Sequence, residues 1–283
     1  MSTLDMPAMP ALPDMTPRYS ASNRVPHVTW DFWLIKLVAV TMGETAADFL
    51  AVNLGLGLTA TSLFMAAVLC LALIPQVEAK RYVPWRYWLA VVLISIVGTL
   101  VTDNLVDNFG VSLAATTVAF TVALAATFWA WWRSERTLSI HYVTTDRREM
   151  FYWLAILFTF ALGTAAGDLV AETFGLGYLA TGLLFGLTIA AIAFCHYVLE
   201  MNAILAFWLA YILTRPLGAS FGDLLSQPSE YGGLGLGTVV TSVIFLATIA
   251  GVVLYMLATI AGVVLYMTAA SRGDNEVRLD RAA

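Results

Sequence analysis

Charge is scarce in this sequence of 283 residues: 12% are Asp, Glu, Lys or Arg, while 60% are hydrophobic. A soluble domain of average composition carries about twice that share of charge. The chain is therefore expected to be a polytopic membrane protein whose main partner is the lipid bilayer. The formal net charge of −5 says little about other partners when most of the chain lies in lipid, and we expect no nucleic-acid partner.

Cysteine and histidine are also rare, with two and three copies. Cys70 and Cys195 each fall inside an apolar stretch, so neither a disulfide framework nor a thiolate metal site is indicated. The sequence has no HExxH, no GxSxG and no phosphate-cradling loop, and its charged loops are too short for a soluble catalytic domain. We expect neither an enzyme nor a bound cofactor, although the acids described below leave an intramembrane aspartyl hydrolase open.

Eight stretches are apolar and long enough to cross a bilayer, because a helix needs about 20 residues to span ~30 Å of hydrocarbon. They cover about 31–54, 57–78, 86–108, 111–133, 150–174, 177–199, 204–226 and 237–268. We therefore predict an all-α bundle of eight transmembrane helices. The predicted divisions are a disordered tail at 1–28, membrane halves at 29–134 and 150–268, a linker at 135–149 and a second tail at 269–283.

Basic residues and tryptophans mark one end of these predicted spans. The connections after the odd-numbered spans contain no Lys or Arg, and every basic residue except Lys36 and Arg215 lies in the other connections or near the termini. All nine tryptophans fall at the same end as the basic residues. The positive-inside rule then predicts that both termini are cytoplasmic.

A tryptophan is followed ten residues later by a glycine and five residues after that by an aspartate, four times along the chain. The tryptophans recur at steps of 55, 65 and 55 residues, which indicates two pseudo-symmetric halves, each with two copies of a two-helix unit. Because each unit has two spans, the four motif helices are predicted to be parallel repeats. The sets are Trp33/Gly43/Asp48, Trp88/Gly98/Asp103, Trp153/Gly163/Asp168 and Trp208/Gly218/Asp223.

The motif glycines each have a second small residue four positions later. This spacing lets helix backbones approach closely in lipid. We therefore predict a helix-packing role for Gly43, Gly98, Gly163 and Gly218.

The motif aspartates need a different explanation, because a carboxylate inside a membrane is costly and usually functional. Four of them facing one interior would repel unless they were protonated or shared a cation. More acids follow at helical spacing, and oxygen ligands of this kind select hard cations such as Mg²⁺, Ca²⁺ and Mn²⁺. We predict a cation site of Asp48, Asp103, Asp168, Asp223 and Glu44, with Asp107 and Glu172 at its entrance.

Two basic residues lie inside the predicted spans. Lys36 is one turn from a helix end and is expected to extend its ammonium group to the interface. Arg215 lies in mid-span beside Pro216 and needs an acidic partner on another helix, for which Glu44 is the candidate. Such a pair would be rebuilt when a cation competes for the acid, so Arg215 is either a gating counter-charge or part of a structural ion pair.

Several of these motifs together resemble a family of bacterial inner-membrane proteins catalogued as uncharacterised membrane-anchored proteins. They are the aromatic-Trp helix start, the Gly-x4-Asp element, the Gly175–Tyr178 turn and the Ile212–Gly218 stretch. The resemblance covers about 28–260 and implies a multi-pass fold in the bacterial inner membrane. It implies no activity and no site residue.

The function predicted from these observations is transport of a small cation, most of all a divalent metal ion, with coupling to protons left open. One alternative is a membrane scaffold or regulator whose acids and Arg215 only fix helix packing. Another is a carrier of an anionic or organic solute centred on Arg215. Leu246–Met256 is repeated unchanged as Leu257–Met267, which predicts a last helix too long for the bilayer that must tilt, protrude or pack against a second protomer.

Overall fold

In the computed structural model, the described residues are 23–248, 250, 251 and 254, and none of them forms a strand. Seven long helices fill most of this region, and an eighth, called here the last helix, has its described part at Gly237–Thr248. The duplicated segment Leu246–Met267 therefore lies largely outside the described residues. The seven are α1 (Trp30–Asp48), α2 (Leu58–Glu78), α3 (Pro84–Asp103), α4 (Leu113–Glu135), α5 (Asp146–Asp168), α6 (Gly177–Val198) and α7 (Ala203–Ser226).

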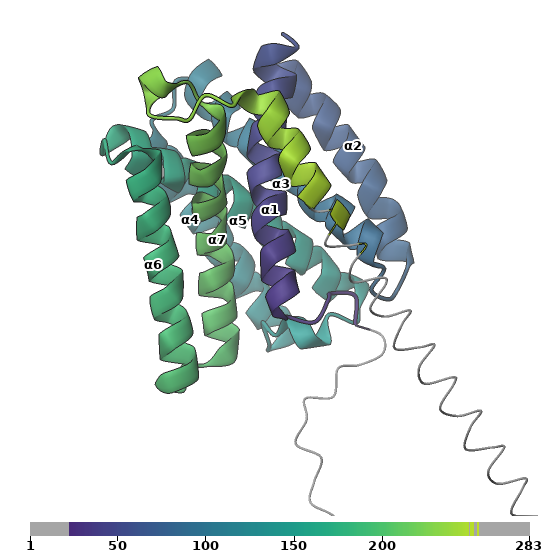
Figure 1. Ribbon diagram of the computed structural model, residues 1–283. Helices are drawn as coiled ribbons and strands as arrows, with labels where there is room; N and C mark the ends of the chain where they lie inside the picture. Colours follow the sequence, from purple (N-terminus) through teal and green to yellow (C-terminus); the bar gives the residue numbers. More distant parts are fainter. Residues whose placement is uncertain (1–22, 249, 252–253, 255–283) are drawn as a thin grey trace, which may run out of the picture.

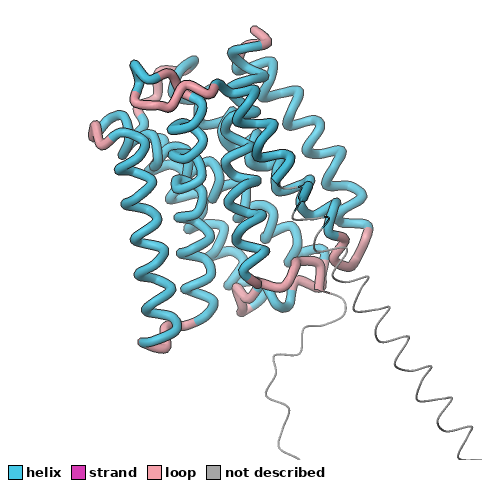
Figure 2. The backbone as a smooth tube through the Cα atoms, in the orientation of Figure 1, coloured by secondary structure: helices cyan, strands magenta, loops and turns pink. Residues whose placement is uncertain are grey.

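The odd-numbered helices form an inner ring. α1 contacts α3 and α7, and α5 contacts the same two helices from the other side. The even-numbered helices lie outside the ring, and each packs on the inner helix of the following unit: α2 on α3, α4 on α5 and α6 on α7. Figures 1 and 2 show the helices lying side by side with short connections at the two ends.

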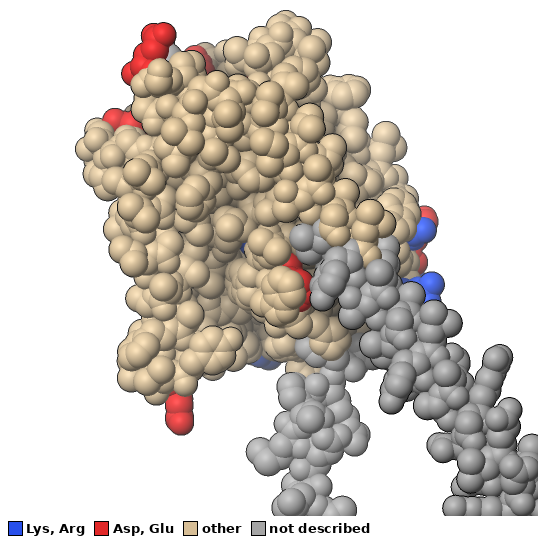
Figure 3. All heavy atoms as spheres, viewed as in Figure 1, with Lys and Arg blue, Asp and Glu red and all other residues tan. Residues whose placement is uncertain are grey.

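Burial separates the two layers. In the spans of α3, α5 and α7, 67, 56 and 50% of the residues are buried, against 17, 22 and 11% in α2, α4 and α6. The outer helices thus present broad apolar surfaces, and the face seen in Figure 3 has almost no charged atoms along the length of the helices. A surface of this kind is suited to lipid rather than to water.

Six helices are long and apolar enough to cross a membrane, namely α2 to α7, with α3 and α5 extended by the segments that follow them. α1 is not among them because it carries Lys36, Glu44 and Asp48. The described part of the last helix is apolar but shorter. The prediction of an all-α protein with several apolar spans and internal repeats is therefore confirmed, while the count of eight membrane spans stays a prediction.

The inner helices all run in the same direction, so the bundle has two different ends. We call the end that holds Trp33, Trp88, Trp153 and Trp208 the tryptophan end. We call the opposite end, which holds Asp48, Asp103, Asp168 and Asp223, the aspartate end.

The four motif glycines make equivalent contacts around the inner ring. Each faces the residue that lies three positions before the glycine of the next unit. A Cβ built on Gly43, Gly98, Gly163 or Gly218 would lie 2.0 to 2.8 Å from a side-chain atom of Ser95, Phe160, Arg215 or Val40, respectively. Helix backbones approach this closely only where a side chain is missing.

Three inner helices change to a π-helix immediately after their motif aspartate. The segments are Phe49–Asn53, Asn104–Asn108 and Leu169–Thr173. The second contains Asp107 and the third contains Glu172. π-Helical turns are rare in proteins overall, but those that occur are often found at functional sites. α7 remains an α-helix to Ser226, and the longer loop after it forms a 3₁₀ turn at Ser229–Tyr231.

The predicted N-terminal tail begins to be structured earlier than expected. Residues 23–28 are described and lie against the tryptophan end, where the Asn23 amide donates to Ile140 and accepts from the Val143 backbone at 3.2 and 3.0 Å. Arg24 is 3% exposed and pairs with Glu149 at 2.6 Å. Ile140 and Val143 lie in the connection between α4 and α5, which contains a 3₁₀ turn at Ile140–Tyr142, and Glu149 lies in the first turn of α5. Sequence periodicity gives no sign of these contacts.

The glycine contacts predict an asymmetry between two Gly→Ala substitutions. In Gly98→Ala the new Cβ would lie 2.8 Å from Phe160 Cβ and 3.2 Å from the Ala161 backbone nitrogen, so α3 and α5 must separate. We expect a loss of about 1–3 kcal/mol in the free energy of unfolding, measured in detergent.

The control is Gly186→Ala on an outer helix, where the new Cβ would lie 3.6 Å from a Leu217 methyl group. Alanine favours a helix over glycine by about 1 kcal/mol, so this variant should be as stable as the unmodified protein or more stable. Equal stability of the two variants would show that the inner ring does not depend on the glycine contact.

Candidate functional site

A polar cavity of about 240 Å³ opens at the aspartate end, between the inner helices. Tyr178 and Gln227, which the sequence analysis did not single out, also line it, and a few apolar side chains complete the wall. All seven acids that the sequence analysis grouped together contribute: Glu44, Asp48, Asp103, Asp107, Asp168, Glu172 and Asp223.

The acids lie at different depths. Asp107 and Glu172 are exposed at the mouth, as the spacing along their helices led us to expect. Asp48, Asp103 and Asp168 are half-buried below them, one from each of three inner helices. Asp223 and Glu44 are the most buried, at 7% and 5% exposed. The cavity is thus a funnel whose walls carry carboxylates from mouth to floor.

The carboxylates surround the cavity without converging on one point. Among the residues that the structure describes, no three His, Cys, Asp or Glu side chains are close enough together to hold a metal ion. The aspartates lie on four different helices of the ring, which spaces them around the axis.

Arg215 lies at the floor of the cavity region and is completely buried. Its Nη2 atom donates to Glu44 on α1, to Thr99 on α3 and to Thr164 on α5, the last at 2.7 Å. Thr99 also donates to the Glu44 carboxylate at 3.1 Å. One guanidinium nitrogen therefore joins side chains from all three other inner helices. We call Arg215, Glu44, Thr99 and Thr164 the arginine clamp.

The arginine clamp arises from equivalent positions of unequal units. Glu44, Thr99 and Thr164 each follow a motif glycine, and the fourth unit has Ala219 in this place. Arg215 itself lies three residues before its glycine, directly against Gly163. The fourth unit therefore supplies the cation and the other three supply its partners. The Arg215–Glu44 pairing agrees with the expectation from the sequence.

Only one of the three guanidinium nitrogens of Arg215 is used in this way. The Nε and Nη1 atoms are buried and have no hydrogen-bond partner among the described residues. An arginine in a purely structural ion pair commonly uses a two-pronged contact with the carboxylate. The single-nitrogen contact holds Arg215 less completely than such a contact would.

Lys36 occupies the next layer toward the tryptophan end. It is completely buried, its ammonium group donates to the Tyr211 backbone carbonyl at 3.0 Å, and it lies 3.9 Å from the centre of the Tyr211 ring. The expectation that Lys36 reaches the membrane interface is therefore wrong. The side chain points into the ring because α1 is an inner helix, a fact that the position of Lys36 along the chain does not reveal.

Aromatic side chains close the ring below Lys36. Tyr87 and Tyr152 are buried and join their hydroxyl groups at 2.6 Å, and Phe32 packs against Trp88 and Tyr211. Of the nine tryptophans, Trp30, Trp85, Trp129 and Trp132 are exposed, whereas Trp88, Trp131, Trp153 and Trp208 are buried in the core.

The fold and the site define a four-unit helical repeat protein with several apolar spans and a carboxylate-lined cavity at one end. A family model described as Repeat of Unknown Function (DUF347) matches residues 32–82, 86–137, 151–202 and 206–271. The chain belongs to this family, and the four matched units coincide with the two-helix repeats predicted from the sequence. No curated protein and no solved structure matches the chain.

The arginine clamp predicts a strong effect of replacing its cation. Arg215→Leu keeps the Cβ and Cγ atoms that face Gly163 but leaves Glu44 buried without its partner. Removing one member of a buried pair costs about 3–5 kcal/mol, so we expect a loss of this size in thermal unfolding experiments. The double variant Arg215→Leu/Glu44→Gln should regain most of it.

Arg148→Leu is the matched control, because Arg148 pairs with Glu135 at 2.8 Å but both side chains are partly exposed. Such pairs contribute about 0–1 kcal/mol. A clamp variant no less stable than the Arg148 variant would mean that Arg215 does not hold the inner ring together.

Proposed function

We propose that this protein is an integral membrane transporter for a small cation, most of all a divalent metal ion, and that it spans the membrane with eight helices. The observation that carries the proposal is the cavity whose walls hold seven carboxylates, one of which, Glu44, is buried and paired with Arg215. Acids in an apolar bundle are costly, and a layer repeated on every inner helix has no obvious packing role.

The geometry supports a cation that keeps part of its water. The carboxylates do not converge into a set of three that could hold a bare ion. The cavity of about 240 Å³ has room for roughly eight water molecules at their liquid volume of about 30 Å³ each. Mg²⁺ and similar hard ions bind in this way, with several waters and few direct carboxylate contacts.

The arginine clamp supports a transporter with a gate rather than an open channel. A cation that reaches the floor competes with Arg215 for Glu44, and below it must pass the buried ammonium group of Lys36 and an aromatic layer. The buried charge of Arg215 opposes conduction of a cation. Transport therefore requires that Arg215 leave Glu44 when the cation arrives, which makes Arg215 the gating counter-charge.

The direction of the cavity follows from the proposed topology. If the basic tryptophan end faces the cytoplasm of a bacterial inner membrane, the acidic cavity opens to the other side. Coupling to protons fits the same site, because neighbouring carboxylates without a cation are neutralised by protons.

The two alternatives account for less of the site. A carrier of an anionic or organic solute centred on Arg215 would draw its substrate past seven carboxylates, which repel an anion and offer an uncharged organic solute little apolar contact. A scaffold would be expected to pair its buried acids with each other or with bases, yet Glu44 is the one cavity acid that has an ion-pair partner among the described residues.

Flux measurements with an aspartate variant test the proposal. We expect Asp168→Asn to lose most ion-dependent uptake or efflux in proteoliposomes, because the amide cannot supply the negative charge that offsets the cation. The control is Glu230→Gln, which changes an acid outside the cavity, in the loop at the same end.

Equal flux through both variants, with equal amounts of folded protein, would refute transport through the acidic cavity. A thermal-shift series with Mg²⁺, Ca²⁺, Mn²⁺ and Na⁺ on the same preparations identifies the ion. Stabilisation by one of them in the unmodified protein and not in Asp168→Asn is the expected result, since a ligand stabilises only the state that binds it.

A further inference from the structure

Lys36 is a buried base that neither the acidic cavity nor the arginine clamp uses. Equivalent residues of the four units form layers across the inner ring, and Lys36 occupies the layer next to that of Arg215. The two neighbouring layers lie four residues to either side, at Phe32 and Val40 of α1. These three layers contain no Asp or Glu, and their titratable side chains are Lys36, Arg215, Tyr87, Tyr152 and Tyr211.

The contacts of Lys36 include no counter-charge. Its Nζ atom donates to the Tyr211 backbone carbonyl at 3.0 Å and lies 3.9 Å from the centre of the Tyr211 ring. The ion pairs of the described residues all lie elsewhere in the molecule. On its own helix, Glu44 is paired with Arg215, and Asp31 lies five residues away, about 140° around the helix.

A single aromatic ring links Lys36 to the arginine clamp. The Lys36 Nζ atom and the Arg215 Cζ atom lie 5.6 and 5.7 Å from the centre of the Phe160 ring. Two positive charges this close repel each other strongly where water is excluded. The protonation of Lys36 is therefore sensitive to any further positive charge that reaches the arginine clamp.

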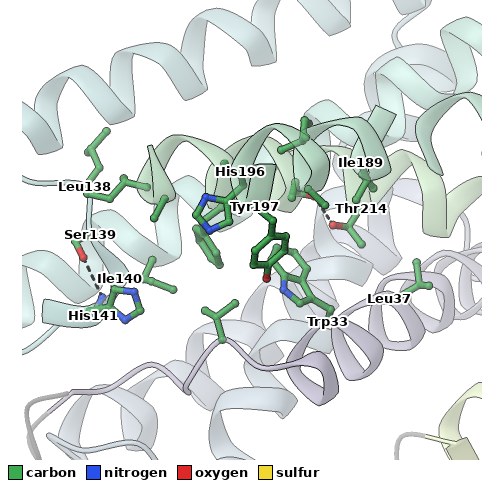
Figure 4. A pocket seen from close by; sticks show the side chains of 18 of the residues that line it. Trp33, Leu37, Leu138, Ser139, Ile140, His141, Ile189, His196, Tyr197 and Thr214 are labelled. Carbon is green, nitrogen blue, oxygen red and sulfur yellow. Dashed lines mark hydrogen bonds between the residues drawn. The ribbon is translucent and has the colours of Figure 1, made fainter. Parts of the chain in front are cut away.

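The outer side of the Lys36 layer supplies no acid either. An apolar cavity of about 640 Å³ lies there, between α1, α6 and α7. Figure 4 shows that Trp33 and Leu37 of α1 line it, whereas Lys36, which lies between them in the sequence, does not. Among the residues that the structure describes, its wall includes His141 and His196 but no Asp or Glu. Within this part of the chain, Lys36 thus has no counter-charge on the ring side or on the outer side.

We propose, on the basis of the transport function above, that Lys36 is the proton site of a cation–proton exchange. Lys36 gives up its proton when a cation reaches the arginine clamp and regains it when the cation leaves. A cation beside Glu44 adds positive charge next to two bases, Arg215 and Lys36. Lysine is the one that responds, because the guanidinium group of arginine is not deprotonated in proteins.

Loss of this proton breaks no ion pair. The neutral amine still has two N–H groups, so Lys36 keeps its hydrogen bond to the Tyr211 carbonyl and its contact with the Tyr211 ring. An acid partner would hold the ammonium form through an ion pair, and the three layers contain none. The contacts of Lys36 therefore serve both of its protonation states.

The released proton has hydroxyl groups to pass through toward the tryptophan end. Tyr87 and Tyr152, in the layer on that side of Lys36, are buried and share a hydrogen bond of 2.6 Å between their hydroxyl groups. In the transfer, an Nζ–H bond breaks and its electron pair stays on nitrogen, while each hydroxyl group accepts one proton and gives up another. Water at the tryptophan end is the final acceptor, and the reverse sequence restores the ammonium group.

The chain contains two lysines, Lys36 and Lys80, so the proton on Lys36 can be followed directly by NMR. The full chain, labelled with ¹³C at the lysine Cε atoms and placed in nanodiscs, is measured over a series of pH values before and after addition of Mg²⁺ or Ca²⁺. We expect the cation to raise the ratio of amine to ammonium at Lys36 about tenfold, because one further charge nearby shifts a proton equilibrium by about one pH unit. Lys80, which is exposed in the connection after α2, is the internal reference and should not respond. Lys36→Met assigns the two signals.

Thermal unfolding of the same samples separates the proton exchange from the transport function. A thermal shift with no change in the Lys36 signal would overturn the exchange and leave the cation site standing. No thermal shift and no change at Lys36 with either ion would overturn both. A change at Lys36 that is lost in Asp168→Asn is the expected result, since the cation then acts from the acidic cavity.

Proton movement in proteoliposomes gives a second readout. Lys36→Met removes a buried base that has no acid partner among the described residues, so we expect the variant to fold and to keep its stabilisation by the cation. A cation gradient should then no longer move protons, and the signal of a pH-sensitive dye should fall to that of protein-free vesicles. The control is Lys80→Met, which should move as many protons as the unmodified protein. Equal proton movement by the two variants would overturn the exchange.

Discussion

The arginine clamp is the contact on which the inner ring depends. Arg215 brings one positive charge to the centre of an apolar bundle, and three other helices contact its Nη2 atom through Glu44, Thr99 and Thr164. A buried guanidinium without such partners would be too costly to keep. All four inner helices must therefore pack together for this charge to be tolerated. The positions of α1, α3 and α5 along the ring axis are then set by their contacts with the Arg215 Nη2 atom of α7.

The motif glycines make this closure possible. Gly163 removes the side chain that would collide with Arg215, and the other three glycines bring their neighbours to the same distance around the ring. Close approach is a repeated, symmetric property, whereas the charge is carried by one unit alone. A four-fold scaffold thus holds an asymmetric centre with one cation and one directly paired acid, and the gate that we propose would alternate between a paired and a released state of it.

Sequence reasoning found the repeat, the parallel inner helices and the seven acids because these depend on spacing, which the chain displays directly. It also identified Glu44 as the partner of Arg215, since both break the pattern of their units. It did not place Lys36 or the buried tryptophans, because proximity to a helix end does not tell whether a side chain faces lipid or the ring. The π-helical segments after Asp48, Asp103 and Asp168 were likewise missed, since hydrophobic periodicity is insensitive to one wider turn.

The two ends of the axis impose opposite constraints on anything that moves along it. From the aspartate end, carboxylates line the path as far as Glu44, which is paired with Arg215. From the tryptophan end, the path is closed by packed aromatic rings and by Lys36, whose ammonium group is held by a backbone carbonyl rather than by an acid. If Arg215 left Glu44, the carboxylate would be free to bind a cation. A guanidinium that moved toward the tryptophan end would meet no second acid there. The natural destination of a displaced Arg215 is therefore the aspartate layer, where Asp223 lies on its own helix and Asp168 on the neighbouring one. In the transport that we propose, such a movement would exchange one carboxylate partner for another, so that neither the cation nor the arginine would be left without a counter-charge in the bundle.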